Sequence, residues 1–440
     1  PMPTRSTVAR WAALLVGLPL LALALVVLAD AIPDRFVLYR LRDAIEADQL
    51  DASSYSTGYT GGQVDGYSEC KRMTVGLGAP PGMGPLESAI RSPTLGPCET
   101  AVPAVLRWAE GDELSRGYQY FRYWNGSAAL LRPTVAAVGV AGTRLLAALA
   151  LAAAAIMLMW RVVRSVGAVS AGLLGAPLLL TTDFIDLPGA LVQAIGMVVA
   201  LTGAALLLWF LPASARLSTY AAAAFACGAT AQFFGDLTNP DAAWALAVAA
   251  VAMLAVNAGD IAFAARRVGA AAAGWIVGFA WIWFSKWVIA AFVIGYDTVR
   301  FVVTNKTEER LTGDVDGADP SLTAGLSAAW RVWRGQPLTT LTMVAFVAVA
   351  IVVLVRRRDL SSTWQPRLLL ASAAAIPVAW HLVMRNHTGV HFWFTYRSLA
   401  VALGIVLMAA TARLVAPQPP ADDDASGGET GDQASITSRV

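Results

Sequence analysis

Charged residues are scarce in this chain. Only 14% of its 440 residues are Asp, Glu, Lys or Arg, whereas 57% are hydrophobic, and the mean hydropathy is +0.58. A soluble domain carries about 25% charged residues, so this composition excludes a water-soluble globular protein. The formal net charge of +2 is too small for the basic surface that nucleic acid requires, and we therefore expect no nucleic-acid partner.

The chain also lacks the motifs of soluble nucleotide enzymes. It contains no P-loop, no dinucleotide-binding glycine fingerprint, no GxSxG nucleophile elbow and no CxxC pair. We therefore expect no chemistry on soluble nucleotides. No tandem repeat of about 20 to 50 residues is visible. Lysine occurs only at positions 71, 286 and 306, and this bias toward Arg and Ala favours a GC-rich bacterial source.

Long apolar stretches dominate the sequence instead. A run of about 20 apolar residues spans the hydrocarbon core of a bilayer. The first run follows Arg5 and Arg10 as a signal peptide would, but its apolar part is too long, so we expect an anchor. The sequence therefore predicts an all-α polytopic membrane protein. Its ten transmembrane helices are expected at 11–31, 142–160, 166–182, 188–210, 218–234, 242–258, 270–294, 338–355, 366–384 and 394–415.

Arginine asymmetry predicts the orientation of these spans. With the N-terminus inside, the clusters at Arg161 and Arg164, Arg216, Arg266 and Arg267, and Arg356 to Arg358 all fall on the cytoplasmic side. The C-terminus is then also inside. Two large segments, 32–141 and 297–337, fall outside, within a membrane domain that covers 1–415. The tail 416–440 is rich in Pro, Asp, Gly and Ser, and we expect it to be disordered in the cytoplasm.

The first outer segment holds two of the three cysteines. Cys70 and Cys98 would lie in an oxidising compartment, where a disulfide between them closes a loop of about 29 residues and contributes about 3 kcal/mol. The alternative is two free thiols. The same segment begins with VLYRLRDAIEADQL, in which Val37, Leu41 and Ile45 share one face at helical spacing. This pattern predicts an amphipathic helix that lies on the membrane surface.

Carboxylates collect on the predicted outer face. Asp65 and Glu69 lie in VDGYSEC, directly beside the predicted disulfide. A rigidly held carboxylate at the bilayer edge is what a general base needs to activate an acceptor hydroxyl; the alternative is a solvated loop acid. Asp183 and Asp236, in short outer turns, are candidates for binding a sugar or acceptor, and capping of the following helix is the alternative for Asp236.

Lys286 lies well inside an apolar span, in GWIVGFAWIWFSKWVIAAFVIGY. A cation at that depth costs roughly 2.5–3.5 kcal/mol, so such residues face a cavity and pair with an anion. A lipid-borne phosphate would satisfy Lys286, and so would Asp183, Asp186 or Asp236 in a structural ion pair. Snorkelling to the outer interface is a further alternative.

The three histidines of the chain fall within HLVMRNHTGVHFWFTYRSL. His387 and His391 have the spacing of two zinc ligands on one helix face, but the Glu of an HExxH motif is absent, so we expect no zinc. Arg397 provides bidentate contacts to phosphate. We therefore expect His387, His391, Tyr396 and Arg397 to bind phosphate or sugar; the alternative is an interfacial belt of aromatic and cationic side chains.

A fourth segment, FRYWNGSAALLRPTV, precedes the second span. Tyr123 and Trp124 suit stacking against a sugar ring, and Asn125 suits recognition of its hydroxyl groups, with Arg122 and Arg132 nearby. The alternative is a helix lying at the membrane interface.

The layout resembles the GT-C superfamily of polyprenol-phosphate-dependent membrane glycosyltransferases. DGYSE, RYWNGSAALLRP, SKW and HTGVHFWFTYRSL are similar to patterns in a group of largely uncharacterised bacterial envelope proteins with that layout. The resemblance implies Asp65 as the catalytic acid or base, with Glu69 as its substitute. It also implies that Lys286 and Arg397 hold the donor phosphate. GT-C enzymes often carry paired acids soon after the first span, whereas here Asp30 and Asp34 stand apart, so Asp34 remains a rival base.

These observations predict an inverting glycosyltransferase of the bacterial plasma membrane, active on the extracytoplasmic face. It would move a sugar from a polyprenyl-phosphate donor to an envelope glycan or lipid-linked acceptor, in contact with membrane lipids. No nucleotide is required, and a divalent cation is left open as a cofactor. Two alternatives remain: a transporter or flippase of a polyprenyl-linked sugar or other anionic lipid, and a non-enzymatic envelope scaffold.

Overall fold

A computed structural model describes residue 9 and residues 11–53, 55–57, 63–256, 260–311, 321–335, 337–356 and 360–414. The described chain is almost entirely helical, which confirms the predicted all-α class. Each of the ten predicted spans contains a helix or a helical run. The tail predicted at 416–440 lies outside the described residues.

Seven helical stretches of the described chain are long and apolar enough to cross a membrane, which supports a multi-pass membrane protein. Helices α8 (Ala168–Thr181) and α11 (Pro240–Val256) are apolar but shorter. Helix α10 (Leu217–Gly235) is long enough, but its Ser, Thr, Tyr and Gln residues make it less apolar. The seven stretches are Ala13–Asp30, Ala128–Val166, Leu191–Phe210, Ile261–Ile294, Thr339–Arg356, Thr363–Val383 and Phe392–Thr411.

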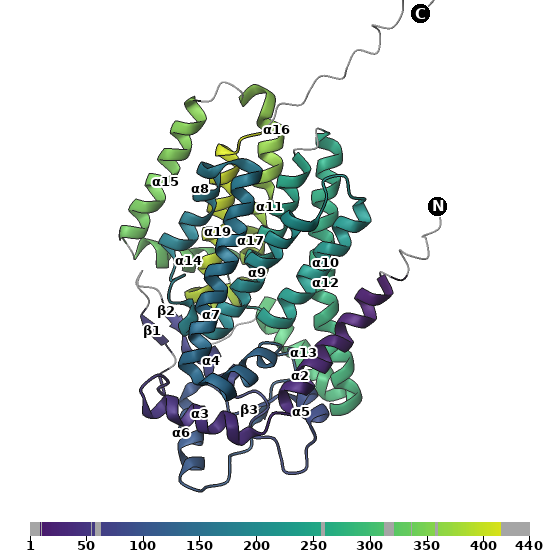
Figure 1. The fold of residues 1–440 in the computed structure, drawn as a ribbon, viewed down its shortest axis with the longest axis vertical. Helices are drawn as coiled ribbons and strands as arrows, with labels where there is room; N and C mark the ends of the chain where they lie inside the picture. The colour runs from purple at the N-terminus through teal and green to yellow at the C-terminus, as the bar shows by residue number, and fades with distance from the viewer. Residues whose placement is uncertain are drawn as a thin grey trace, which may run out of the picture.

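Most of the segment 32–141, which is predicted to lie outside and is called the outer segment below, folds into short elements gathered at one end of the helical bundle (Figure 1). A disulfide joins Cys70 to Cys98 and ties α4 to α6, which confirms the predicted pairing. Two small antiparallel ribbons, β1–β2 and β3–β4, complete this part. After η1 (Ala13–Gly17) and α2 (Leu18–Asp30), the elements are α3 (Asp34–Glu46), β1 (Tyr55–Thr57), β2 (Gln63–Asp65), α4 (Gly66–Met73), α5 (Pro85–Arg91), β3 (Pro93–Thr94), α6 (Cys98–Ala109) and β4 (Tyr118–Gln119).

The predicted surface helix is present as α3, but its apolar face is covered by protein. Val37, Leu38 and Leu41 are at most 2% exposed, and α3 packs against α6 and α7. The expectation that this face rests on the membrane is therefore wrong. An amphipathic pattern shows only that one face avoids water, and a neighbouring helix satisfies that requirement as well as lipid does.

Helix α7 (Ala128–Val166) begins inside the segment predicted to be an outer loop. Its 39 residues are interrupted at Gly139, which has a φ of 72° that breaks the regular helix. The remaining elements are η2 (Leu187–Gly189), α9 (Leu191–Phe210), α12 (Ile261–Ile294), α13 (Tyr296–Leu311), α14 (Ala324–Arg334), α15 (Pro337–Arg356), α16 (Leu360–Ala371), η3 (Ser372–Ala374), α17 (Ala375–Val383), α18 (Arg385–Val390) and α19 (Phe392–Thr411).

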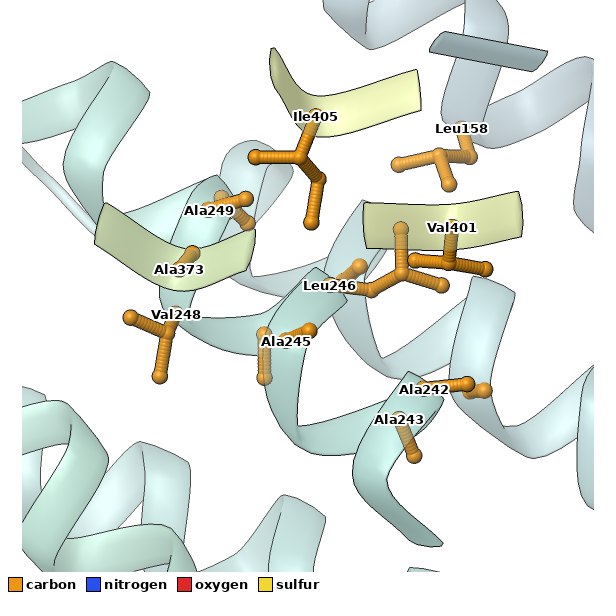
Figure 2. Packing of buried hydrophobic residues seen from close by; sticks show 14 of the residues in the cluster. Leu158, Ala242, Ala243, Ala245, Leu246, Val248, Ala249, Ala373, Val401 and Ile405 are labelled. Atoms are coloured by element: carbon orange, nitrogen blue, oxygen red, sulfur yellow. The ribbon is translucent and has the colours of Figure 1, made fainter. Parts of the chain in front are cut away.

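The alanine-rich helix α11 forms the centre of the bundle. Its neighbours are α9, α10, α12, α16, α17 and α19, and nearly all of its side chains are buried. Figure 2 shows Leu246 of α11 beside Val401 of α19. Because Ala adds only a methyl group, six helices approach one axis closely, and the packing holds the ends of α10 and α19 in fixed positions.

Two arginines of the predicted cytoplasmic loops contact neighbouring helices near the C-terminal end of α9 and the N-terminal end of α10. Arg161 donates to Leu208 O at 2.5 Å, and the Arg413 amide donates to Val166 O at 2.9 Å. The Arg267 guanidinium lies 5.3 Å from the Tyr220 ring centroid. The orientation in a membrane and the count of ten crossings stay predictions.

Candidate anion-binding cavity

A polar cavity of about 110 Å³ lies where α4 and the 120–123 segment meet the C-terminal end of α10. Its walls come from five separate parts of the chain, the last of them α18 and the start of α19. The polar and aromatic side chains that line it include Asp65, Tyr67, Ser68, Lys71, Arg72, Tyr120, Arg122, Tyr123, Asp236, Arg310, His387 and His391.

Helix α4 positions much of this wall. Asp65 is its N-cap, and the carboxylate Oδ1 accepts the Ser68 amide at 3.0 Å, as an Asp at this position normally does. Helical periodicity then places Lys71 and Arg72 on the cavity side. The opposite side carries Glu69 and Cys70, which fasten α4 to α7 and α6. The predicted base thus lies on a helix that is anchored from behind.

Three cations surround the aromatic ring of Tyr120. The charged groups of Lys71, Arg72 and Arg122 lie 5.0, 5.0 and 4.7 Å from its centroid. Burial acts to raise the pKa of the Tyr120 hydroxyl, but the charges of Arg122, Arg72 and Lys71 outweigh it and lower the pKa to about 8. The lowered pKa reflects the positive charge that these three side chains place around the Tyr120 hydroxyl.

Only one of the cavity cations forms an ion pair with a lining carboxylate. Arg72 Nη2 lies 2.5 Å from Asp236 Oδ2, and burial still raises the pKa of Asp236 to about 6 against the opposing charge of Arg72. Within the described residues, Lys71, Arg122 and Arg310 have no carboxylate oxygen within 4.0 Å, and Asp65 has no cationic partner within that distance.

His387 and His391 lie side by side in the cavity wall, with ring centroids 4.9 Å apart. Burial and the charge of Arg310 lower the pKa of His391 to about 3, and burial together with His391 lowers that of His387 well below its usual value. Both rings are therefore neutral at pH 7.

Their tautomers follow from their partners. His387 Nε2 lies 3.2 Å from Leu237 O and must carry its proton, while His391 Nε2 lies 3.0 Å from Arg310 Nη1 and must accept. This leaves His387 Nδ1 as an acceptor and His391 Nδ1 as a donor, both buried and both without a partner among the described residues. Such a donor and acceptor pair suits hydroxyl groups of a ligand. In the described chain, no three His, Cys, Asp or Glu side chains are grouped to hold a metal ion.

No protein-family model matches this chain, and no curated protein or solved structure matches it. The site therefore rests on its own geometry.

Of the predicted site residues, the cavity brings together Asp65, Tyr123, Asp236, His387 and His391. The ring of Tyr123 stacks on that of Trp283 at 5.6 Å between centroids, so one of its faces is already occupied.

The structure places Lys286 outside the cavity lining. Its ammonium donates to Ala89 O at 2.7 Å and to Ser92 Oγ at 3.3 Å, and lies 5.2 Å from the Trp124 ring centroid. Lys286 thus fastens α12 to the outer segment. Trp124 is fully buried, and its indole N–H donates to Ile282 O.

The other predicted residues do not line the cavity and have partners of their own. Asp34 accepts from Arg132 at 2.9 Å, and Tyr396 donates to Asp183 at 3.1 Å. Asn125 has a φ of 57°, and its amide holds the turn by donating to Tyr120 O and Tyr123 O.

Glu69 is bound from behind α4 by Arg144, at 3.1 Å. Burial nevertheless raises the pKa of Glu69 to about 7, because desolvation exceeds the attraction of Arg144. Its partner lies on α7, away from the cavity.

Sequence reasoning missed Lys71, Arg72, Tyr120 and Arg310. A signal for Arg72 was available, because it follows Asp65 by seven residues and therefore returns to the same face of a helix. Lys71, six residues after Asp65, has no such spacing. Arg310 could not have been found, since it reaches the cavity only through the packing of α13 against α18.

Proposed function

We propose that the protein is a membrane glycosyltransferase that takes a sugar from a lipid-linked phosphate donor and passes it to an acceptor hydroxyl. The observation that carries the proposal is the Asp65 carboxylate in a cavity with Lys71, Arg122 and Arg310, none of which forms an ion pair with a described carboxylate. The long apolar helices support a place in a bilayer, and a cavity at the edge of the bilayer would have access to a polyprenyl-phosphate donor.

The charge balance of the cavity fits the departing phosphate better than the intact donor. Arg72 and Asp236 neutralise one another, so Lys71, Arg122 and Arg310 face a single further negative charge, that of Asp65. The surplus is two positive charges. A phosphodiester donor carries one negative charge, whereas the phosphomonoester released from it carries close to two at neutral pH. Fixed cations therefore stabilise the transition state more than the ground state, which is what catalysis requires.

The reaction assigned to this site is a single displacement. Asp65 accepts the proton of the acceptor hydroxyl as the oxygen forms a bond to the anomeric carbon. The bond between that carbon and the phosphate oxygen breaks, and the phosphate leaves with the electron pair. The configuration at the anomeric carbon is inverted. Neutral His387 and His391 offer an acceptor and a donor to the sugar hydroxyl groups.

The topology expected from the sequence completes the proposal. We infer ten crossings, with both termini in the cytoplasm and the cavity on the extracytoplasmic face of a bacterial plasma membrane. The acceptor is then an envelope glycan or a lipid-linked precursor.

The test is a deletion strain complemented with wild type, Asp65→Asn or Asp297→Asn. Asp297 is an exposed acid at the start of α13, outside the cavity, and gives a matched control. Glycan linkages of the envelope and the pool of polyprenyl-phosphate sugars are measured in each strain. We expect one sugar linkage to disappear and its donor to accumulate in the deletion, with rescue by wild type and Asp297→Asn only.

Two results would overturn the proposal. If glycan and donor pool are unchanged in the deletion, the transport and scaffold alternatives replace it. If Asp65→Asn restores the linkage while a further strain that carries Asp34→Asn does not, the base is Asp34.

A further inference from the structure

Three buried polar side chains form a chain of hydrogen bonds behind the cavity. Gln193 of α9 donates its amide Nε2 to Asp65 Oδ2 at 3.2 Å, and its Oε1 accepts from Arg397 Nη1 of α19. All three side chains are at most 2% exposed. We propose that Gln193 positions the Asp65 carboxylate and that Arg397 is the buried counter-charge of that carboxylate, without contacting the donor. This inference rests on the proposed function.

The orientation of the Gln193 amide is fixed by its two neighbours. A guanidinium only donates, so the amide oxygen must face Arg397. The NH₂ group is then left for Asp65, which accepts it. Because Asp65 Oδ1 already accepts the Ser68 amide, both carboxylate oxygens are held by N–H donors. Each keeps a second lone pair, so the carboxylate stays able to take a proton from a hydroxyl.

Arg397 needs this link as much as Asp65 does. It lies in a membrane-spanning helix with no exposed surface, and in the described chain no carboxylate oxygen is within 4.0 Å of it. Among the described residues, the only hydrogen bond of its guanidinium goes to Gln193, and its Nε and Nη2 have none. The nearby Asp183 oxygen accepts from Tyr396 instead. A buried guanidinium without a nearby anion is costly, and the chain through Gln193 leads to the negative charge of Asp65.

The same arrangement argues against direct contact between Arg397 and the donor. Arg397 does not line the cavity, whereas Arg72, Arg122 and Arg310 do. Gln193 stands between the guanidinium and the carboxylate. Loss of Arg397 or Gln193 should therefore slow the chemical step through Asp65 and leave binding of phosphate to the cavity intact.

The test compares Gln193→Glu, Gln193→Met, Arg397→Gln and Arg122→Gln in the detergent-purified full chain. Gln193→Glu keeps an acceptor for Arg397 but places a second carboxylate next to Asp65. Gln193→Met has a similar volume and removes the hydrogen bonds to Asp65 and to Arg397. It replaces the first variant in the test if Gln193→Glu does not fold. Isotope-edited infrared spectra record the Asp65 carboxylate bands, identified by their loss in Asp65→Asn. Calorimetry measures the binding of inorganic phosphate, and membranes of complemented strains are assayed for formation of the sugar linkage.

We expect both Gln193 variants to shift the Asp65 carboxylate bands and to lower the transfer rate about 100-fold, the scale of a misplaced catalytic group. Phosphate affinity should change by less than about twofold in the Gln193 and Arg397 variants, but fall at least about tenfold in Arg122→Gln, which loses a charge-assisted contact. Unmoved bands, or phosphate affinity lost in Arg397→Gln, would overturn the inference. Failure of the proposed function gives a different result. The strain with Asp65→Asn would then keep the glycan linkage, whether or not the carboxylate bands of Asp65 shift in the Gln193 variants.

Discussion

Tyr120 is the residue through which the cavity should sense pH. Its hydroxyl has a pKa of about 8, because three cations stabilise the phenolate. As pH rises through that value, the phenolate adds a negative charge next to Lys71, Arg72 and Arg122. The positive potential that attracts an anion then falls. Phosphate binding should therefore be strong at pH 7 and weaken above pH 8.

We predict that Tyr120→Phe removes this alkaline loss. Phosphate affinity, measured by calorimetry between pH 6 and 10, should stay level in the variant to a higher pH than in wild type. Tyr118→Phe is the matched control, because Tyr118 does not line the cavity and its pKa is raised by burial. If phosphate affinity falls at the same alkaline pH in wild type and in Tyr120→Phe, a group other than Tyr120 controls the loss.

Individual residues also show how much of the site could be predicted from the sequence. Asp65 was found because a carboxylate beside a cysteine has a local signature. Arg122 was noticed beside the aromatic residues but was not assigned to the phosphate. Gln193 could not be predicted, because no sequence motif marks a neutral amide in an apolar helix. Its role follows only from the packing of α9 against α4. Lys286 is conspicuous in the sequence because it is a cation inside an apolar span. In the structure its ammonium donates to a carbonyl and a hydroxyl of the outer segment and does not line the cavity.

At the scale of elements, α4 depends on its covalent link to α6. The helix has only eight residues, which is too short to be stable by itself in water. The Cys70–Cys98 disulfide holds it from the side opposite to Lys71 and Arg72. The disulfide therefore preserves the geometry of the cation cluster as well as the stability of the outer segment.

We predict that Cys70→Ser with Cys98→Ser destabilises the outer segment by about 3 kcal/mol and abolishes phosphate binding to the cavity. Thermal unfolding and calorimetry on the purified chain measure the two effects. Cys227→Ser is the control, because this free thiol lies in α10 and takes no part in the disulfide. Full phosphate binding in the double variant would mean that packing alone holds α4.

Close contact between α10 and α12 is a second feature at this scale. Gly274 and Gly278 of α12 face the backbone of α10, where a Cβ would overlap Ala221 O and Phe225 O. This spacing of small residues is typical of helices that pack in membranes.

We predict that Gly278→Val separates the two helices and lowers the thermal stability of the detergent-purified protein. Gly269→Val on the same helix should be tolerated, because nothing lies within 4 Å of its Cβ position; equal stability of the two variants would contradict the prediction.

For the whole molecule, the apolar pattern was the most informative part of the sequence. It predicted helices in all ten segments because a run of about twenty apolar residues can be recognised from the local sequence alone. It could not predict where α3 would pack or that α7 would begin at Ala128, because both depend on partners far away in the chain. The charge asymmetry of the loops predicts an orientation in the membrane, but it carries no information about which side chains contact one another at either end of the bundle.

The cavity combines residues from α4 at one extreme of the chain and from α18 at the other. During synthesis, the helix with Asp65 therefore emerges long before His387 and His391 exist. No nascent or truncated chain that ends before α18 can hold the complete set of binding groups. If the cavity has the proposed function, the protein gains its activity only when its last helices are inserted, and a prematurely terminated chain is an inactive fragment that cannot cleave the donor.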